Sequence, residues 1–153
     1  MKLAEALKER ADLNRKINEL RMRLQNNALV QDGEKPAEDP KALLTELDAA
    51  IERLQLLMAA INKTNCAVEI GGRTVTDLIA EKDALTLQAS AYRNLIDTAS
   101  ARVDRYSRTE IKITSTVDVK KLQKKADDLS KRIRLLDNQL QECNWTTDLQ
   151  GLE

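Results

Sequence analysis

The chain of 153 residues contains no histidine and no phenylalanine, and aromatic residues make up only 2% of it. Without histidine, Ser-His-Asp and Cys-His catalysis are excluded, and so is the commonest general base. No Walker loop or GxGxxG motif occurs. We therefore expect a non-enzymatic protein. An enzyme built on Arg, Tyr, Lys and carboxylate groups stays an open alternative.

Cysteine is also scarce, since Cys66 and Cys143 are the only two. They are far apart in the sequence and form no CxxC motif, which argues against a zinc site and a disulfide framework. Adjacent carboxylates such as Asp127 and Asp128 diverge on a helix, and we interpret them as solvated. We expect no metal and no cofactor.

Long uncharged runs are missing as well. The longest, at residues 54–62 and 84–92, are nine residues each, whereas a membrane-spanning helix needs about twenty apolar residues. No apolar signal segment stands near the first residue, and the 25 basic residues are balanced by 25 acidic ones. These features favour a cytoplasmic protein without a nucleic-acid partner and without stable membrane insertion.

Only four glycines and two prolines interrupt the chain, and aliphatic residues recur at alternating spacings of three and four. This heptad spacing predicts long amphipathic helices. We expect helices at about 3–27, 40–65, 76–106 and 117–143, packed as an antiparallel, coiled-coil-like bundle in one domain over residues 1–153. The last segment has the cleanest seam, in which no charged residue interrupts Val119, Leu122, Ala126, Leu129, Ile133, Leu136, Leu140 and Cys143.

Short β-prone runs separate the helices. Gly71-Gly72 between residues 66–70 and 73–75 predicts a tight hairpin. A further strand is predicted at 110–115, and we expect these strands to form a small cap at one end of the bundle. Asp39 before Pro40 and Ser115 before Asp118 match helix-start patterns.

The second helix is apolar nearly all round between residues 54 and 61. This pattern indicates burial on more than one side, and a neighbouring subunit could cover the second side. We therefore expect a homo-oligomer whose interface includes Leu54, Leu57, Met58 and Ile61.

Basic residues gather at the end of the predicted third helix, where Arg105, Tyr106, Arg108 and Lys112 follow one another closely. If Arg73 joins them, the group has the planar donors that bind a carboxylate or phosphate. The alternative interpretation is that these cations complement the end of the helix dipole. The identity of any small-molecule ligand is left open.

Several polar stretches resemble the septicolysin-like family of small bacterial proteins. They are Met1–Leu7, Ala37–Pro40, Ile61–Asn65, Gly72–Asp77, Asp104–Arg108, Glu110–Lys112, Ser115–Asp118 and Asn144–Thr147. The resemblance implies a cytolysin active on membranes, with no established catalytic or binding residues to carry over. The residues themselves favour a helical assembly or interaction protein that self-associates, with a cytolysin and a small anion-binding domain as the two alternatives.

Overall fold

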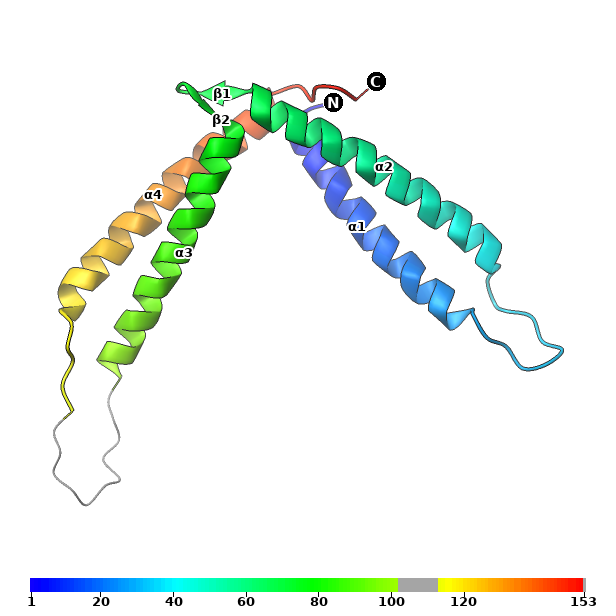
Figure 1. Cartoon of the computed structure of the whole chain (residues 1–153), viewed down its shortest axis with the longest axis horizontal. Helices are drawn as coiled ribbons and strands as arrows, with labels where there is room; N and C mark the ends of the chain where they lie inside the picture. The colour runs from blue at the N-terminus through cyan, green and yellow to red at the C-terminus, as the bar shows by residue number, and fades with distance from the viewer. Residues whose placement is uncertain (102–112, 153) are drawn as a thin grey trace, which may run out of the picture. The chain divides into compact units, whose positions relative to one another are not determined.

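The structure, a computed structural model, describes residues 1–101 and 113–152. It is mainly α-helical, as the sequence predicts (Figure 1). Four helices, α1 (Leu3–Asn26), α2 (Pro40–Ala67), α3 (Val75–Ser100) and α4 (Val119–Thr146), are joined with two short strands, β1 (Glu69–Ile70) and β2 (Arg73–Thr74).

The chain divides into two compact units. The first contains Met1–Val75 and Gln141–Glu153, and the second contains Thr76–Leu140. In the first unit α1 and α2 lie side by side, and in the second α3 and α4 do (Figure 1). That all four helices pack in one bundle and that they form one domain remain predictions.

The helix starts follow local chemistry. The side chain of Asp39 accepts a hydrogen bond from the backbone N–H of Lys41 at 3.0 Å, and Pro40 opens α2. This confirms the predicted cap. At α4 the carboxylate of Asp118 accepts a hydrogen bond from the N–H of Lys121, whereas the bonds of Ser115 within the described residues are with Val117. The predicted start at residue 117 is therefore two residues early.

The hairpin confirms the prediction from Gly71-Gly72. Glu69 pairs with Thr74 and Ile70 with Arg73 in antiparallel register. Gly71 and Gly72 have φ values of 62° and 81°, which only glycine adopts readily twice in succession.

Several other predicted boundaries are also wrong. Cys66 and Ala67 belong to α2 rather than to a strand, Val75 belongs to α3, and Ala101 lies beyond the end of α3. The third helix ends early although no glycine or proline stops it; its last turn closes with a hydrogen bond from the N–H of Ala101 to the carbonyl of Thr98. Residues 113–115 form no strand, and the predicted residues 102–106 and 110–112 lie outside the described part.

The core of the second unit confirms the predicted seam of α4. Leu78, Leu85, Ala89 and Ile96 of α3 are buried, and so are Ala126, Leu129, Leu136 and Leu140 of α4. Lys82 interrupts the α3 seam, but its ammonium group reaches the carboxylate of Asp137 on α4. Arg132 pairs with Glu81 in the same way.

In the first unit, two adjacent leucines of α2 provide a direct test of the packing. Leu57 is fully buried and Leu56 is 53% exposed. Leu57→Ala should lower the free energy of unfolding by about 2–5 kcal/mol, because it leaves a cavity in the core. The matched change Leu56→Ala should cost less than about 0.5 kcal/mol. Urea unfolding measures both, and equal losses would contradict this placement of α2.

Candidate interaction surface

The apolar residues of α2 divide into two parallel rows. The core row, Leu43, Ala50, Leu57 and Ile61, is buried. The exposed row consists of the residues that follow the first three of these, Leu44, Ile51 and Met58, whose side chains are 47%, 47% and 46% exposed. Successive residues on a helix are rotated by about 100°, so the exposed row is not on the face that α1 covers.

The core row packs on α1. Leu57 and Ile61 form a buried cluster with Leu3 and Ala6, and Leu7 and Leu13 are packed against it. The interface predicted from the sequence therefore contains residues of two kinds: Leu57 and Ile61 are covered within the chain itself, Leu54 is half-buried, and Met58 is exposed.

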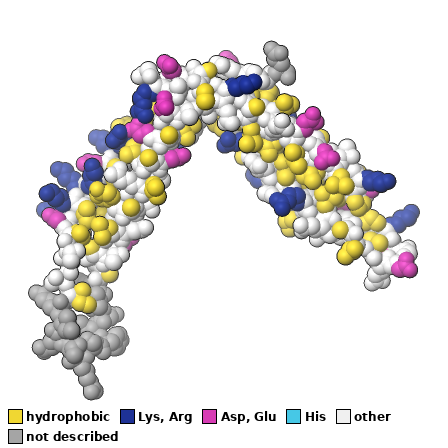
Figure 2. Space-filling model, viewed as in Figure 1, with side chains coloured by type: hydrophobic (Ala, Val, Ile, Leu, Met, Phe, Trp, Pro, Cys, Tyr) yellow, Lys and Arg dark blue, Asp and Glu magenta, His cyan; other side chains and the backbone are white. Residues whose placement is uncertain are grey.

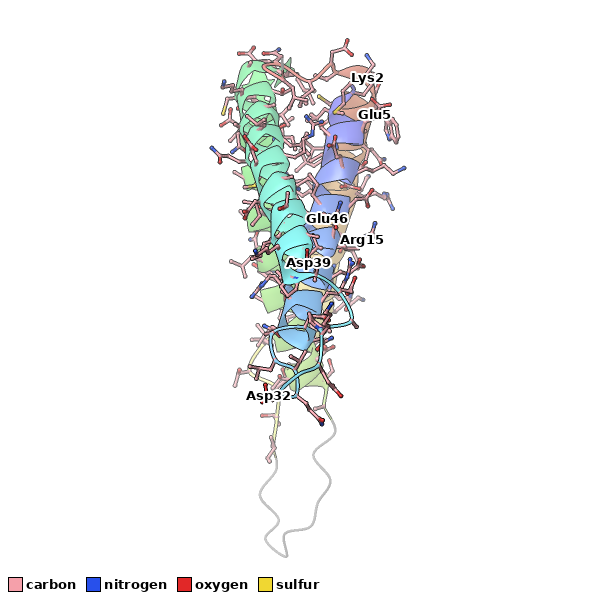
Figure 3. All side chains as sticks on the ribbon, turned by 90° about the vertical axis from the view of Figure 1, so that its right-hand side faces the viewer. Lys2, Glu5, Arg15, Asp32, Asp39 and Glu46 are labelled. Carbon is pink, nitrogen blue, oxygen red and sulfur yellow. The ribbon has the colours of Figure 1, made fainter. Side chains whose placement is uncertain are left out.

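Ion pairs join α1 to α2. The guanidinium of Arg53 donates to both carboxylate oxygens of Glu9, at 2.6 and 3.0 Å. Lys16 lies 2.8 Å from Glu46, and Arg23 donates through Nε and Nη2 to the carboxylate of Glu38 in the loop before α2. Figure 3 labels Glu46 on α2 and Asp39 immediately before the helix. These contacts place the core row toward α1.

The loop between α1 and α2 is anchored by Asn27. Its side-chain amide donates to the carbonyl of Arg23 at 2.9 Å, and its side-chain oxygen accepts from the N–H of Glu38 at 3.0 Å. The two helices are thus tied at the loop end as well as along their length.

The segment after α4 completes the first unit. The N–H of Leu3 donates to the carbonyl of Thr147, and the N–H of Leu149 donates to that of Met1, both at 2.9 Å. Leu149 and Leu152 pack against the buried cluster. The predicted helix end at residue 143 is three residues early, since α4 continues to Thr146, and the tail after it covers part of the core.

Thr64 is the polar residue that holds this tail. It is fully buried, its hydroxyl donates to the carbonyl of Ala60 at 2.8 Å, and the hydroxyl oxygen accepts from the N–H of Gln150 at 2.9 Å. A threonine within an apolar helix face gives no sequence signal for a partner 86 residues away, so sequence reasoning missed it.

The predicted anion site is only partly described. Arg73 lies on β2 with an exposed side chain, whereas Arg105, Tyr106, Arg108 and Lys112 lie outside the described residues. That site remains a prediction. Within the described residues, no group of histidine, cysteine or carboxylate side chains has an arrangement that would hold a metal ion. The described helices also include none long and apolar enough to cross a membrane.

Comparison with known proteins places the chain in a family. Residues 10–149 match the family of unknown function DUF6847, and the chain belongs to that family. It is also similar to a protein of solved structure, described as a functionally unknown conserved protein from Corynebacterium diphtheriae. The two share 42% identity over 98% of this chain and 99% of that one, with a TM-score of 0.93. No curated protein matches the chain.

These findings correct the resemblance drawn from the polar stretches. The matched family is DUF6847, and neither comparison points to a septicolysin-like protein. The quoted stretches are short, and four of them lie at helix starts or at the hairpin turn, where capping and turn chemistry favour the same residue types in unrelated proteins. The cytolysin that this resemblance implied is withdrawn with it.

Replacing Thr64 with valine should release the tail. Thr64→Val keeps the shape of the side chain but removes both hydrogen bonds, so we expect the unfolding free energy to fall by about 1–2 kcal/mol. Amide hydrogen exchange at Gln150 should become faster, while exchange in the core of α3 and α4 stays unchanged. Unchanged protection of the Gln150 amide would contradict the assigned bond.

The ion pairs of the first unit predict a pH dependence. Hydrogen bonds from Arg53, Arg23 and Lys16 lower the pKa of Glu9, Glu38 and Glu46, in that order, below their usual value. A carboxyl group whose pKa is lower in the folded state stabilises the fold above its unfolded pKa, and that contribution disappears as the pH falls through the folded pKa.

Urea midpoints should therefore fall between pH 6 and pH 3. The triple variant Lys16→Gln, Arg23→Gln, Arg53→Gln should show a smaller fall, because its carboxyl groups have lost their partners. An equal fall in the two proteins would exclude these three pairs as its cause.

Proposed function

We propose that the chain is a non-enzymatic helical interaction protein that self-associates through the exposed row of α2. The observation that carries the proposal is the exposure of Leu44, Ile51 and Met58 at intervals of seven residues. Large aliphatic side chains at this spacing are the pattern of a helix–helix seam.

The residues between them extend this surface. Leu47 and Leu54 are half-buried at its edge, so five aliphatic side chains cover 15 residues of α2, a length of about 21 Å. Figure 2 shows hydrophobic side chains gathered on the visible face of the α1–α2 hairpin. Single exposed apolar residues are common on protein surfaces, but a contiguous apolar group favours a binding site.

The chemistry of the row favours a protein partner over a small polar ligand. It has no charged member, and its side chains gain mainly from removal of apolar area from water, about 25 cal/mol per Å². Among protein partners, we propose a second copy of the chain, which is present wherever the protein itself is present. The cytoplasmic location and the absence of a nucleic-acid partner stay as predicted from composition.

Sedimentation velocity over a range of protein concentrations tests this function. The wild-type chain should associate in the micromolar range, and Ile51→Lys and Met58→Lys should each shift it toward monomer, because a charge would be buried at the contact. Leu56→Lys, on another face of α2, is the matched control and should associate as the wild type does. A wild-type chain that stays monomeric at all concentrations would refute the proposal.

A further inference from the structure

The balanced charge of the chain conceals two oppositely charged segments. Residues 31–52, which form the loop before α2 and its first half, carry seven acidic and two basic residues. Residues 119–134 of α4 carry seven basic and two acidic residues. The acidic residues are Asp32, Glu34, Glu38, Asp39, Glu46, Asp48 and Glu52, and the basic ones are Lys120, Lys121, Lys124, Lys125, Lys131, Arg132 and Arg134.

Only part of this charge is used within the hairpins. Glu38 and Glu46 pair with α1, and Asp39 caps α2. Asp32, Glu34, Asp48 and Glu52 are exposed and make no ion pair with the residues that the structure describes. The acidic segment therefore keeps a negative surface; Figure 3 labels Asp32 in the loop.

The basic segment is left open in the same way. Arg132 pairs with Glu81, whereas Lys120, Lys124 and Lys131 are exposed on the side of α4 opposite its buried seam and make no ion pair with described residues. We call this side the outer face of α4. Lys and Arg side chains gather along the α3–α4 hairpin in Figure 2. Leu135, one turn after Lys131, is 53% exposed.

Charge decides which surface fits the exposed row of α2. Asp48 and Glu52 stand on either side of Ile51 in the sequence, and both are exposed. Two identical α2 surfaces placed together would bring four such carboxylates around the two Ile51 side chains, and like charges at a contact oppose association. A partner helix that carries cations beside an aliphatic residue would pair with the carboxylates and would also cover the aliphatic row.

We infer that the exposed row of α2 in one copy docks on the outer face of α4 in a second copy. This inference rests on the proposed self-association and names its second surface. Leu135 would meet the aliphatic row, and Lys120, Lys124 and Lys131 would face the acidic residues of the loop and of α2. Because the two surfaces differ, a closed dimer forms only if each copy docks its α2 on the α4 of the other. Otherwise each copy leaves one surface free, and further copies can add to form an open assembly.

A charge exchange between two variants tests the contact. The α4 variant carries Lys120→Glu, Lys124→Glu and Lys131→Glu, and the α2 variant carries Glu34→Lys, Asp48→Lys and Glu52→Lys. Each alone should associate at least about tenfold more weakly than the wild type at low salt, because three attractive surface pairs become repulsive. An equimolar mixture should restore association, because each altered surface then meets an opposite charge.

Opposite net charge alone would also attract the two variants, so two single chains with the net charge of the wild type serve as the test and its control. All six substitutions of the α2 and α4 variants in one chain should restore association, because the altered surfaces again carry opposite charges. The α4 variant with Glu19→Lys, Asp83→Lys and Asp97→Lys added has the same net charge but two acidic surfaces, and it should not associate. Circular dichroism should show the same helix content in all variants, since the substituted residues are exposed.

The outcomes separate the inference from the function on which it rests. If Ile51→Lys abolishes association while both charge variants associate normally, self-association through α2 stands and the α4 contact is wrong. Equal association of the control chain and the chain with all six exchanged charges would also overturn the contact. A monomeric wild-type chain would instead refute the proposed function.

Discussion

A helix that has one neighbour buries about one face, and α2 carries more aliphatic residues than one face holds. In the first unit α1 and the tail after α4 cover the core row of α2, and nothing else in that unit covers the exposed row. The rest of the account depends on this excess. The uncharged run at residues 54–62 is the sequence feature that reflects this excess. Its energetic cost is the exposure of apolar side chains to water, which association with another chain would remove.

The orientation of α2 is determined by polar contacts as much as by packing. Two ion pairs join α2 to α1, one between Arg53 and Glu9 and one between Lys16 and Glu46. The hydroxyl oxygen of Thr64 accepts a hydrogen bond from the N–H of Gln150 in the tail. Exposed ion pairs add little stability individually. Their effect here is to fix the rotation of α2 about its own axis. Because these contacts hold α2 at both ends and along its length, rotating the exposed row toward the core would break them.

Sequence periodicity predicted the helices, the glycine hairpin and the buried seam of α4, because each rests on local patterns within one segment. The rotation of α2 about its axis was harder to predict, because Leu43 and Leu44 are equally apolar. Only the contact with α1 shows which of the two is buried. The tail was missed because Leu149 and Leu152 are too few to show a period, and the cluster against which they pack, which includes Leu3 and Ile61, is distant in the chain. Of the four residues predicted for an interface on α2, Leu57 and Ile61 belong to the core, and the interface itself stays a prediction.

Cysteine accessibility along α2 tests the central claim most directly. In a Cys66→Ser background, which retains the buried thiol of Cys143, cysteines introduced one at a time at positions 43, 44, 50, 51, 57 and 58 would be treated with a thiol reagent at low and high protein concentration, with the background protein as the reference. The account predicts fast modification at 44, 51 and 58 in dilute protein, protection of these three at high concentration, and slow modification at 43, 50 and 57 throughout. Modification of 44, 51 and 58 at a rate independent of protein concentration, or fast modification of the core row, would contradict it.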